Sequence, residues 1–292
     1  MNRADLALLL VAAIWGTTFA LLRDSMRILH PVDLMALRFT LAFVALVAVF
    51  WKSVWPLRRR WLLDGAWLGL WLAAGYLTQV VGLVTISASR SAFITGTYVA
   101  FVPLIAVIVL KARPRISEWL GIALVCAGLV AFSADAGFSL APGDFWTLAC
   151  AFTFAVQIII TQGLVKRSGA MELSIVQIAM GALLGWVFVG QRGGIGTPWS
   201  EIPWGTILYL AVAATALVIA LQTWALGRTS PIKATLIFSL EPVFAALFAA
   251  AFFGERMTGR EMAGAGLILV GVLVAEIWGH VSAWIGGKRA GG

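Results

Sequence analysis

Long apolar runs, separated by short polar connections, follow one another along the whole chain. Each run is roughly 17–25 residues long, the length that a helix needs to cross about 30 Å of hydrocarbon. We expect ten membrane-spanning helices, at residues 4–22, 33–51, 62–85, 91–110, 117–134, 144–163, 172–190, 204–226, 232–253 and 260–279. The connections leave no room for a soluble domain. The pattern therefore predicts an all-α integral membrane protein.

The composition supports a membrane location. Hydrophobic residues make up 61% of the chain and charged residues only 12%, whereas soluble domains carry about 25% charged residues. The net charge of +8 could suggest a nucleic-acid partner. However, the basic residues lie at the ends of the predicted helices, where they anchor to lipid head groups. We expect membrane lipids, and no nucleic acid, as partners.

The basic residues also predict the orientation. Fourteen of the 21 Lys and Arg lie on the side of the N-terminus and six on the other, while Arg38 lies inside a predicted helix. Because Lys and Arg are enriched in cytoplasmic loops, both termini are expected in the cytoplasm. The first apolar run is too long for the apolar part of a signal peptide, and no small-x-small cleavage site precedes Arg23. We interpret it as the first helix.

Two halves of the chain repeat the same kinds of residue in the same order. Asp5, Asp33 and Arg38 are followed, at one constant spacing along the chain, by Asp144, Glu172 and Gln177. We call this spacing the smaller offset. A second set of residues repeats at a slightly larger constant spacing, which we call the larger offset. It pairs Gln79, Ser87, Glu118, Gly121 and Gly128 with Gln222, Ser230, Glu261, Gly264 and Gly271. An odd number of helices in each half inserts the second half upside down, as in many secondary transporters with a solute site near the midplane. We predict inverted five-helix halves at residues 1–136 and 137–292.

The two halves differ in the position of a proline. The separation along the chain from Ser87 to Pro103 is greater than the separation from Ser230 to Pro242. The difference is about one helical turn. Proline kinks a helix and frees a carbonyl group that needs a partner in the membrane. Pro103 and Pro242 are therefore candidate gating residues, or bends with a structural role alone. In an alignment on these prolines, Glu241 pairs with Val102.

Four segments resemble a known family: LLLVAAIWGTTFALL, ALRFTLA, SASRSAF and SLEPVFAALFAAAFFGERMTGREMAGAGLILVGVLV. They are similar to the drug/metabolite transporter superfamily, and in particular to its ten-helix EamA-type exporters. The first half has KARPRISEW in place of the GER signature. The resemblance implies two EamA repeats in a bacterial inner membrane, cytoplasmic termini, and export of amino acids or related metabolites.

Polar and aromatic residues inside the predicted spans are candidates for a solute site, because they are costly to expose to lipid. The candidates are Trp15, Thr18, Tyr76, Gln79, Thr95, Tyr98, Phe101, Thr153, Gln157, Gln222, Trp224, Phe238 and Ser239. Gln177 adds another amide. As alternatives, a Thr hydroxyl can bond its own backbone one turn back, and Trp and Tyr often anchor helix ends at the membrane surface.

Two charged residues lie well inside the predicted spans. Arg38 is expected either to extend to the membrane surface or to bond the carbonyl groups of a neighbouring helix. Glu241 precedes Pro242, and it is expected either to couple transport to protons or to accept a hydrogen bond from a neighbouring helix. Both residues are candidate coupling residues.

Amides, hydroxyls and aromatic rings suit a zwitterionic or neutral solute with an apolar side chain. Amino acids fit this inventory best, and lipophilic drugs or cations on the rings come second. Phosphorylated solutes fit badly, because they need clamps of Arg or Lys.

A membrane-embedded enzyme and a channel are alternatives from other classes. The sequence contains no HExxH pattern and no GxxxxGK[ST] phosphate loop. Cys126 and Cys150 both lie inside predicted helices and lack metal-ligand spacing. We therefore expect a transporter that works by alternating access, without a cofactor or a metal. The glycines of the fifth and tenth helices permit close packing, either between the halves or in a homodimer, so a monomer and a homodimer both fit.

Overall fold

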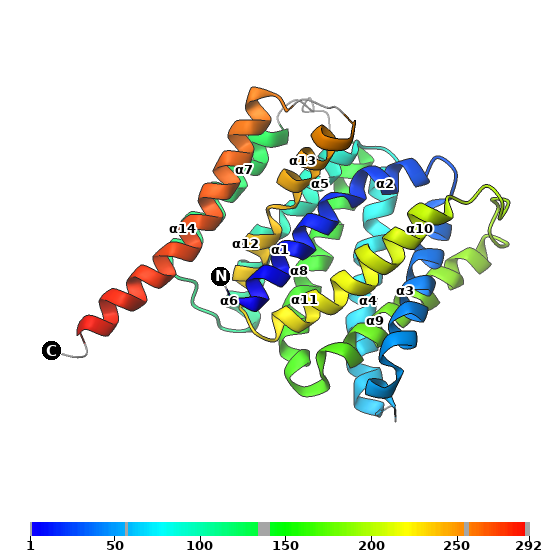
Figure 1. Ribbon diagram of the computed structural model, residues 1–292, viewed down its shortest axis with the longest axis horizontal. Helices are drawn as coiled ribbons and strands as arrows, with labels where there is room; N and C mark the ends of the chain where they lie inside the picture. Colours follow the sequence, from blue (N-terminus) through cyan, green and yellow to red (C-terminus); the bar gives the residue numbers. More distant parts are fainter. Residues whose placement is uncertain (1, 56–57, 134–140, 254–256, 290–292) are drawn as a thin grey trace.

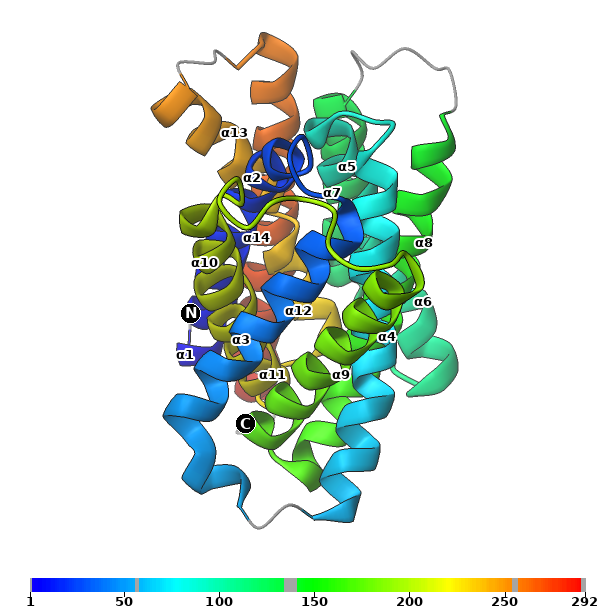
Figure 2. The same cartoon turned by 90° about the vertical axis from the view of Figure 1, so that its right-hand side faces the viewer.

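The computed structural model describes residues 2–55, 58–133, 141–253 and 257–289, and these ranges contain helices and no strand. The predicted boundary between residues 136 and 137 lies outside them, as do residues 254–256, which carry the GER signature. Figure 1 shows one bundle of helices, with α7 and α14 side by side along one edge. Figure 2 shows the same bundle from the side.

In each of the ten predicted spans most of the described residues are helical. Six spans form one helix each: α3 (Pro31–Val54), α4 (Arg59–Leu83), α7 (Ile116–Ser133), α8 (Pro142–Ser168), α9 (Ala170–Gln191) and α14 (Gly259–Arg289). Four are interrupted: α1 (Arg3–Gly16) with α2 (Thr18–Ser25), α5 (Ala88–Gly96) with α6 (Tyr98–Val109), α10 (Trp204–Ala211) with the π-helix η1 (Val212–Leu217) and α11 (Val218–Leu226), and α12 (Pro231–Phe238) with α13 (Glu241–Phe253).

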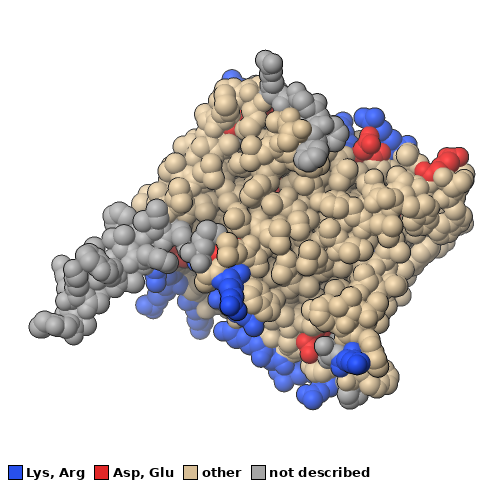
Figure 3. Space-filling model, in the orientation of Figure 1, with Lys and Arg blue, Asp and Glu red and all other residues tan. Residues whose placement is uncertain are grey.

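The helices are apolar enough for a multi-pass membrane protein. In the described residues, eight segments are long and apolar enough to cross a membrane, and residues 116–131 form a shorter apolar helix. The last predicted span lies within α14. Figure 3 shows Lys and Arg gathered along the lower edge of the face in view, in agreement with the uneven division of basic residues in the sequence. Ten crossings remain the prediction from the sequence.

Five pairs of helices from the two halves begin at corresponding residues. α1 and α8 start at the smaller offset from each other, and so do α3 and α9. The starts of α5 and α12, of α6 and α13, and of α7 and α14 are each separated by the larger offset. The caps correspond too, because the Ser87 hydroxyl accepts the N–H of Arg90 and the Ser230 hydroxyl accepts the N–H of Lys233. The two offsets found in the sequence are therefore also the offsets between helix starts.

Three of the interrupted helices break in the same way. The break falls at Thr17 between α1 and α2, at Thr97 between α5 and α6, and at Ser239 and Leu240 between α12 and α13. In each case the hydroxyl at the break donates to a backbone carbonyl oxygen one turn earlier, at 2.7, 2.6 and 2.5 Å. These bonds give the polar backbone at each break a partner inside the protein, which a membrane interior requires.

The breaks correct the expected position of one kink. Pro103 lies within α6, whereas the helix breaks earlier, at Thr97. Pro242 is the second residue of α13, where the missing N–H leaves no helix bond unmade. The first proline therefore does not interrupt its helix, and the second follows a break.

α7 and α14 pack through glycine. A Cβ atom added to Gly121 would lie 2.6 Å from the carbonyl oxygen of Gly271, and one added to Gly128 would lie 2.7 Å from the carbonyl oxygen of Gly264. Such distances are too short for any side chain, so only glycine permits this backbone contact. The predicted glycine faces thus join the two halves within one chain.

Two ion pairs connect corresponding residues at opposite ends of the bundle. At one end, Lys233 of α12 lies 2.9 Å from Asp5 of α1. At the other, Arg90 of α5 bonds both carboxylate oxygens of Asp144 of α8, at 2.7 and 2.6 Å. Asp5 and Asp144 correspond at the smaller offset, and Arg90 and Lys233 at the larger offset. An ion pair therefore joins α1 to α12 at one end, and another joins the corresponding helices, α8 and α5, at the other end.

Candidate functional site

The breaks in the interrupted helices surround a small cavity in the middle of the bundle. Its volume is about 30 Å³, enough for roughly two water molecules. The residues that line it are Trp15, Thr18, Arg38, Tyr76, Gln79, Thr95, Tyr98, Phe154 and Glu241. All except Phe154 were predicted from the sequence, and the lining comes from six of the expected spans.

A second cavity of about 20 Å³ adjoins the first. Trp15, Tyr98 and Phe154 line both cavities, so these three rings stand between them. Gln157 and Gln222, also predicted from the sequence, line the second cavity. Neither cavity has room for an amino acid as the chain stands. A solute can enter only after these rings move apart.

Arg38 is 2% exposed, so its side chain does not reach the membrane surface. Its Nε atom donates to the carbonyl oxygen of Leu210 and to the hydroxyl of Thr215, and its Nη2 atom donates to the carbonyl oxygen of Ala214. These acceptors belong to α10 and η1, where the wide π-turn disturbs the regular helix bonds. The guanidinium also lies 4.8 Å from the centre of the Tyr76 ring. Of the two roles expected for Arg38, bonding to the carbonyl groups of a neighbouring helix is therefore the correct one.

Glu241 is the first residue of α13, where the helix dipole favours a carboxylate. It is 8% exposed and lies beside Tyr98, the first residue of α6. Arg38 and Glu241 line the same cavity but form no ion pair in the described structure. The helix starts pair Glu241 with Tyr98, at the larger offset. The pairing with Val102, which followed from aligning the prolines, is wrong.

Buried amides form a chain beside the second cavity. Gln222 donates to Gln157 at 3.2 Å, Gln157 donates to Gln177 at 3.1 Å, and Gln177 donates to the hydroxyl of Thr223 at 3.2 Å. These bonds satisfy side chains that would otherwise be costly to bury. The chain crosses three spans and fixes the orientation of the two amides that line the cavity.

Three buried polar atoms that line the cavities lack a hydrogen-bond partner of good geometry among the described residues. They are the Tyr98 hydroxyl, the Thr95 hydroxyl and the Gln222 Oε1 atom. Buried polar groups nearly always have a partner. These atoms are therefore positioned to bind water or a solute.

Five of the predicted residues do not line either cavity. Phe101 packs edge-on against Phe152. The Thr153 hydroxyl donates to its own helix, at Ala149 and Cys150. Phe238 lies behind Trp15, with ring centres 5.4 Å apart.

The other two lie elsewhere. Ser239 is fully buried and bonds the backbone at the α12–α13 break. The Trp224 ring packs against the guanidinium of Arg228, 4.3 Å away. The contact of Thr153 fits the alternative of a hydroxyl that bonds its own backbone. The contact of Trp224 fits the alternative of an aromatic anchor near a helix end.

Phe154 lines both cavities but was not predicted. A signal for it exists in the sequence, because Phe154 corresponds to Trp15 at the smaller offset. The same offset pairs Thr18 with Gln157, and the larger offset pairs Gln79 with Gln222. The cavity walls are thus built largely from corresponding residues of the two halves.

Comparison with known proteins gives the family. The model of the EamA-like transporter family matches residues 2–134 and again residues 141–276. This chain belongs to the EamA-like transporter family. It is therefore a multi-pass membrane transporter of the drug/metabolite transporter superfamily, as its sequence resemblance implies.

Individual proteins resemble this EamA transporter over nearly its whole length. An uncharacterized transporter of Archaeoglobus fulgidus is 31% identical over 278 residues, which cover 94% of this chain and 86% of the relative. A probable amino-acid metabolite efflux pump of Salmonella typhimurium is 29% identical over 296 residues, which cover 94% and 95%. One protein of known crystal structure aligns with a TM-score of 0.77 at 19% identity, over 94% of this chain and 96% of that one. This last match shows the fold.

Proposed function

We propose that this EamA transporter exports small zwitterionic metabolites, and in particular amino acids with apolar or aromatic side chains. The observation that carries the proposal is an arginine and a glutamate in one cavity: Arg38 and Glu241 line it without forming an ion pair in the described structure. Between them, aromatic rings and hydroxyls complete the wall. A zwitterion has both charges and an apolar side chain, so its three parts match this lining.

Transport proceeds by alternating access between two inverted halves, residues 1–136 and 137–292. The two separate matches of the family model support this division. Shared helix starts support the repeat, and the ion pairs of corresponding residues at opposite ends of the bundle support its inversion. The small central cavity fits an occluded state, in which both ends are closed.

The breaks in the helices are the points at which opening would occur. Thr17, Thr97 and Ser239 lie one or two residues from residues that line the cavity, and at each break a side-chain hydroxyl bonds the backbone one turn earlier. Bending at such points changes few backbone bonds. Discontinuous helices at the midplane are a recurring device of secondary transporters.

Amino acids are favoured over lipophilic cations by the position of Arg38 in the cavity. Aromatic rings alone would attract a cation, but the Arg38 guanidinium already lies 4.8 Å from the centre of the Tyr76 ring. The relative from Salmonella typhimurium, named as a probable amino-acid metabolite efflux pump, supports the same solute class. The uneven division of Lys and Arg supports cytoplasmic termini in the bacterial inner membrane, from which export would begin.

Counterflow in proteoliposomes tests the proposal. Vesicles preloaded with unlabelled phenylalanine or threonine should accumulate the labelled amino acid faster than unloaded vesicles, because a carrier returns loaded faster than empty. A channel or an enzyme gives no such stimulation. The matched controls are empty liposomes and vesicles preloaded with a lipophilic cation. Stimulation by the cation alone would replace the amino-acid assignment, and no stimulation by any solute would refute a carrier.

A further inference from the structure

The two central cavities differ in the chemistry of their walls. Arg38 and Glu241 both line the first cavity. Besides the three shared rings, the second cavity is lined by Leu72, Ile158, Gln157 and Gln222. Among the described residues, no charged side chain lines this second cavity. On the proposed function, the charged groups of an amino acid lie in the first cavity, and its side chain extends into the second.

One acceptor in the wall of the second cavity has no partner. The Gln222 Oε1 atom forms no hydrogen bond in the described structure, although the residue is only 2% exposed. The Thr95 and Tyr98 hydroxyls are also unpartnered, but a hydroxyl group can rotate and can either donate or accept. An amide oxygen can only accept. Gln222 therefore requires a donor from whatever occupies the second cavity.

The chain of buried amides fixes which atom of Gln222 is left over. The Gln222 Nε2 atom donates to the Oε1 atom of Gln157 at 3.2 Å. The chain continues through Gln177 and returns to α11 at the hydroxyl of Thr223, the residue after Gln222. Turning the Gln222 amide over would bring two acceptor oxygens face to face, with both left unpaired, and unpaired buried acceptors are costly. The left-over atom is therefore an acceptor.

The size of the second cavity sharpens this requirement. Its volume of about 20 Å³ has room for roughly one water molecule, which is able to donate to the amide oxygen. A hydrocarbon side chain that displaces such a water molecule leaves the oxygen unpaired, so it loses affinity. A side chain with an N–H or O–H group at the same point restores the bond.

We propose, on the basis of the proposed function, that the second cavity is the side-chain subsite and that Gln222 selects amino acids whose side chain carries a hydrogen-bond donor. The indole N–H of tryptophan and the hydroxyl groups of tyrosine and threonine meet this requirement. Phenylalanine, leucine and valine do not. A site built to bond a donor discriminates against an analogue of the same shape that lacks it, because the polar group of the site is then left unpaired.

Competition against the counterflow of labelled tryptophan tests the subsite. The competitors are unlabelled tryptophan and its benzothiophene analogue, in which sulfur replaces the indole N–H with little change of shape. The wild type should require about five times as much analogue, or more, for half-inhibition, because the analogue leaves a buried acceptor unpaired. Gln222→Met keeps the length of the side chain and removes the oxygen, so the two competitors should become equally potent.

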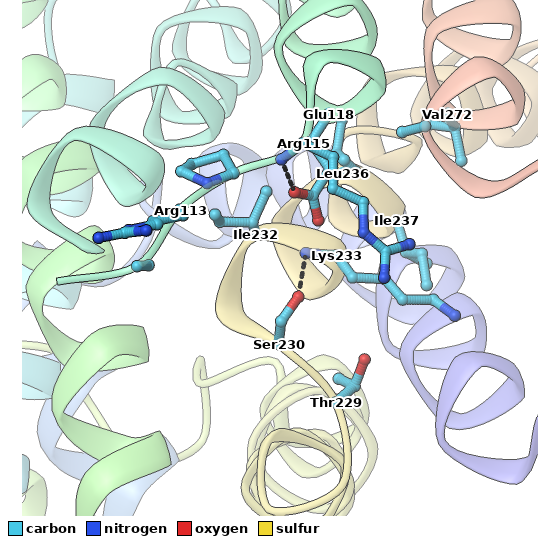
Figure 4. Close-up of a pocket in the computed structure, with 13 residues that line it drawn as sticks. Arg113, Arg115, Glu118, Thr229, Ser230, Ile232, Lys233, Leu236, Ile237 and Val272 are labelled. Atoms are coloured by element: carbon cyan, nitrogen blue, oxygen red, sulfur yellow. Dashed lines mark hydrogen bonds between the residues drawn. The ribbon is translucent and has the colours of Figure 1, made fainter. Parts of the chain in front are cut away.

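Gln162→Met is the matched control. Gln162 also lies on α8, but its amide donates to the backbone carbonyl oxygen of Thr229 at 3.2 Å. Thr229 lines a separate pocket of about 570 Å³ beside α12 and α14 (Figure 4). None of the described residues that line this pocket lines either central cavity. The control variant should therefore keep the preference of the wild type for tryptophan.

Equal potency of the two competitors on the wild type would overturn the proposal, and so would a preference that Gln222→Met retains. If Gln222→Met does not fold, Gln222→Asn replaces it with the same expectation, since it keeps an amide but draws the oxygen back by one methylene group. Counterflow of phenylalanine without counterflow of tryptophan also overturns the subsite while the proposed function stands. Failure of the proposed function gives a different result, because no amino acid then shows counterflow.

Discussion

The ion pairs at the two ends of the bundle predict how the transporter opens. Arg90 and Asp144 form a bidentate pair, with side chains 19% and 9% exposed. Asp144→Asn removes the charge yet keeps an oxygen to cap α8. A hydrogen bond to a charged group contributes about 1.5–3 kcal/mol, and partial exposure favours the lower value. About 1.5 kcal/mol corresponds to roughly a tenfold shift toward the state open at that end.

Alkylation of two reporter cysteines measures this shift. Ser91 follows Arg90, Ala234 follows Lys233, and both reporter positions are fully buried. Ser91→Cys and Ala234→Cys are introduced one at a time, after Cys126 and Cys150 have been replaced by alanine. Asp144→Asn should raise the rate at which a hydrophilic maleimide labels position 91 about tenfold, and it should lower the rate at position 234.

The corresponding change at the other end provides the internal control. Asp5→Asn weakens the pair with Lys233, so it should raise labelling at position 234 and lower it at position 91. Opposite changes at the two reporters are the signature of alternating access. If either substitution raises both rates together, the pairs merely hold the bundle closed, and the reasoning fails. Unchanged rates would show that neither pair takes part in closure.

Three further substitutions test the packing, with thermal unfolding in detergent as the measurement. Arg38→Ala removes one donor from each of the buried carbonyl oxygens of Leu210 and Ala214 and should cost about 2–4 kcal/mol. Full stability would show that water replaces the guanidinium. Gly121→Leu forces α7 from α14 and should cost at least about 2 kcal/mol, whereas Gly266→Leu on the open face of α14 should be neutral; equal losses would contradict the glycine contact. Gln157→Leu interrupts the amide chain and should cost about 1–3 kcal/mol, and the loss should shrink when Gln177→Leu is added.

The sequence predicts the helices well because membrane insertion depends on the length of apolar runs. Every predicted span is mostly helical where described, and both offsets of the repeat recur in the helix starts. The breaks at Thr17 and Thr97 were not predicted. A Thr hydroxyl bonds its own backbone in continuous and in broken helices alike, so the residue type carries no signal for a break. Arg38 bonds residues of the π-turn at η1 from another span, and no local pattern indicates such a contact.

The site shows a similar division. Buried polar residues such as Gln79 and Gln157 could be predicted, because an amide inside the membrane needs a partner. Trp224 could not be assigned from its type, since an aromatic ring suits both a cavity and a membrane surface, and the nearby Arg228 decides its place. Phe154 looked like any lipid-facing phenylalanine. Its correspondence to Trp15 was the available signal.

Glu241 occupies a position at which the two halves differ in charge, because its counterpart is Tyr98. Among the described residues Glu241 forms no ion pair with Arg38, and its carboxylate lies beside Tyr98 and lines the central cavity. It can therefore exchange a proton with a water molecule in the cavity.

The uncharged variant Glu241→Gln keeps the shape and should separate the two roles. We expect it to retain counterflow, which needs no proton, and to lose accumulation driven by a pH gradient. Tyr98→Phe is the comparison at the corresponding position; it leaves the carboxylate in place, so accumulation by this variant should still respond to the pH gradient. If Glu241→Gln retained accumulation driven by the gradient, the carboxylate would not couple protons. If the variant failed to fold in detergent, its role would be the structural one, because a carboxylate that only carries protons is not needed for packing.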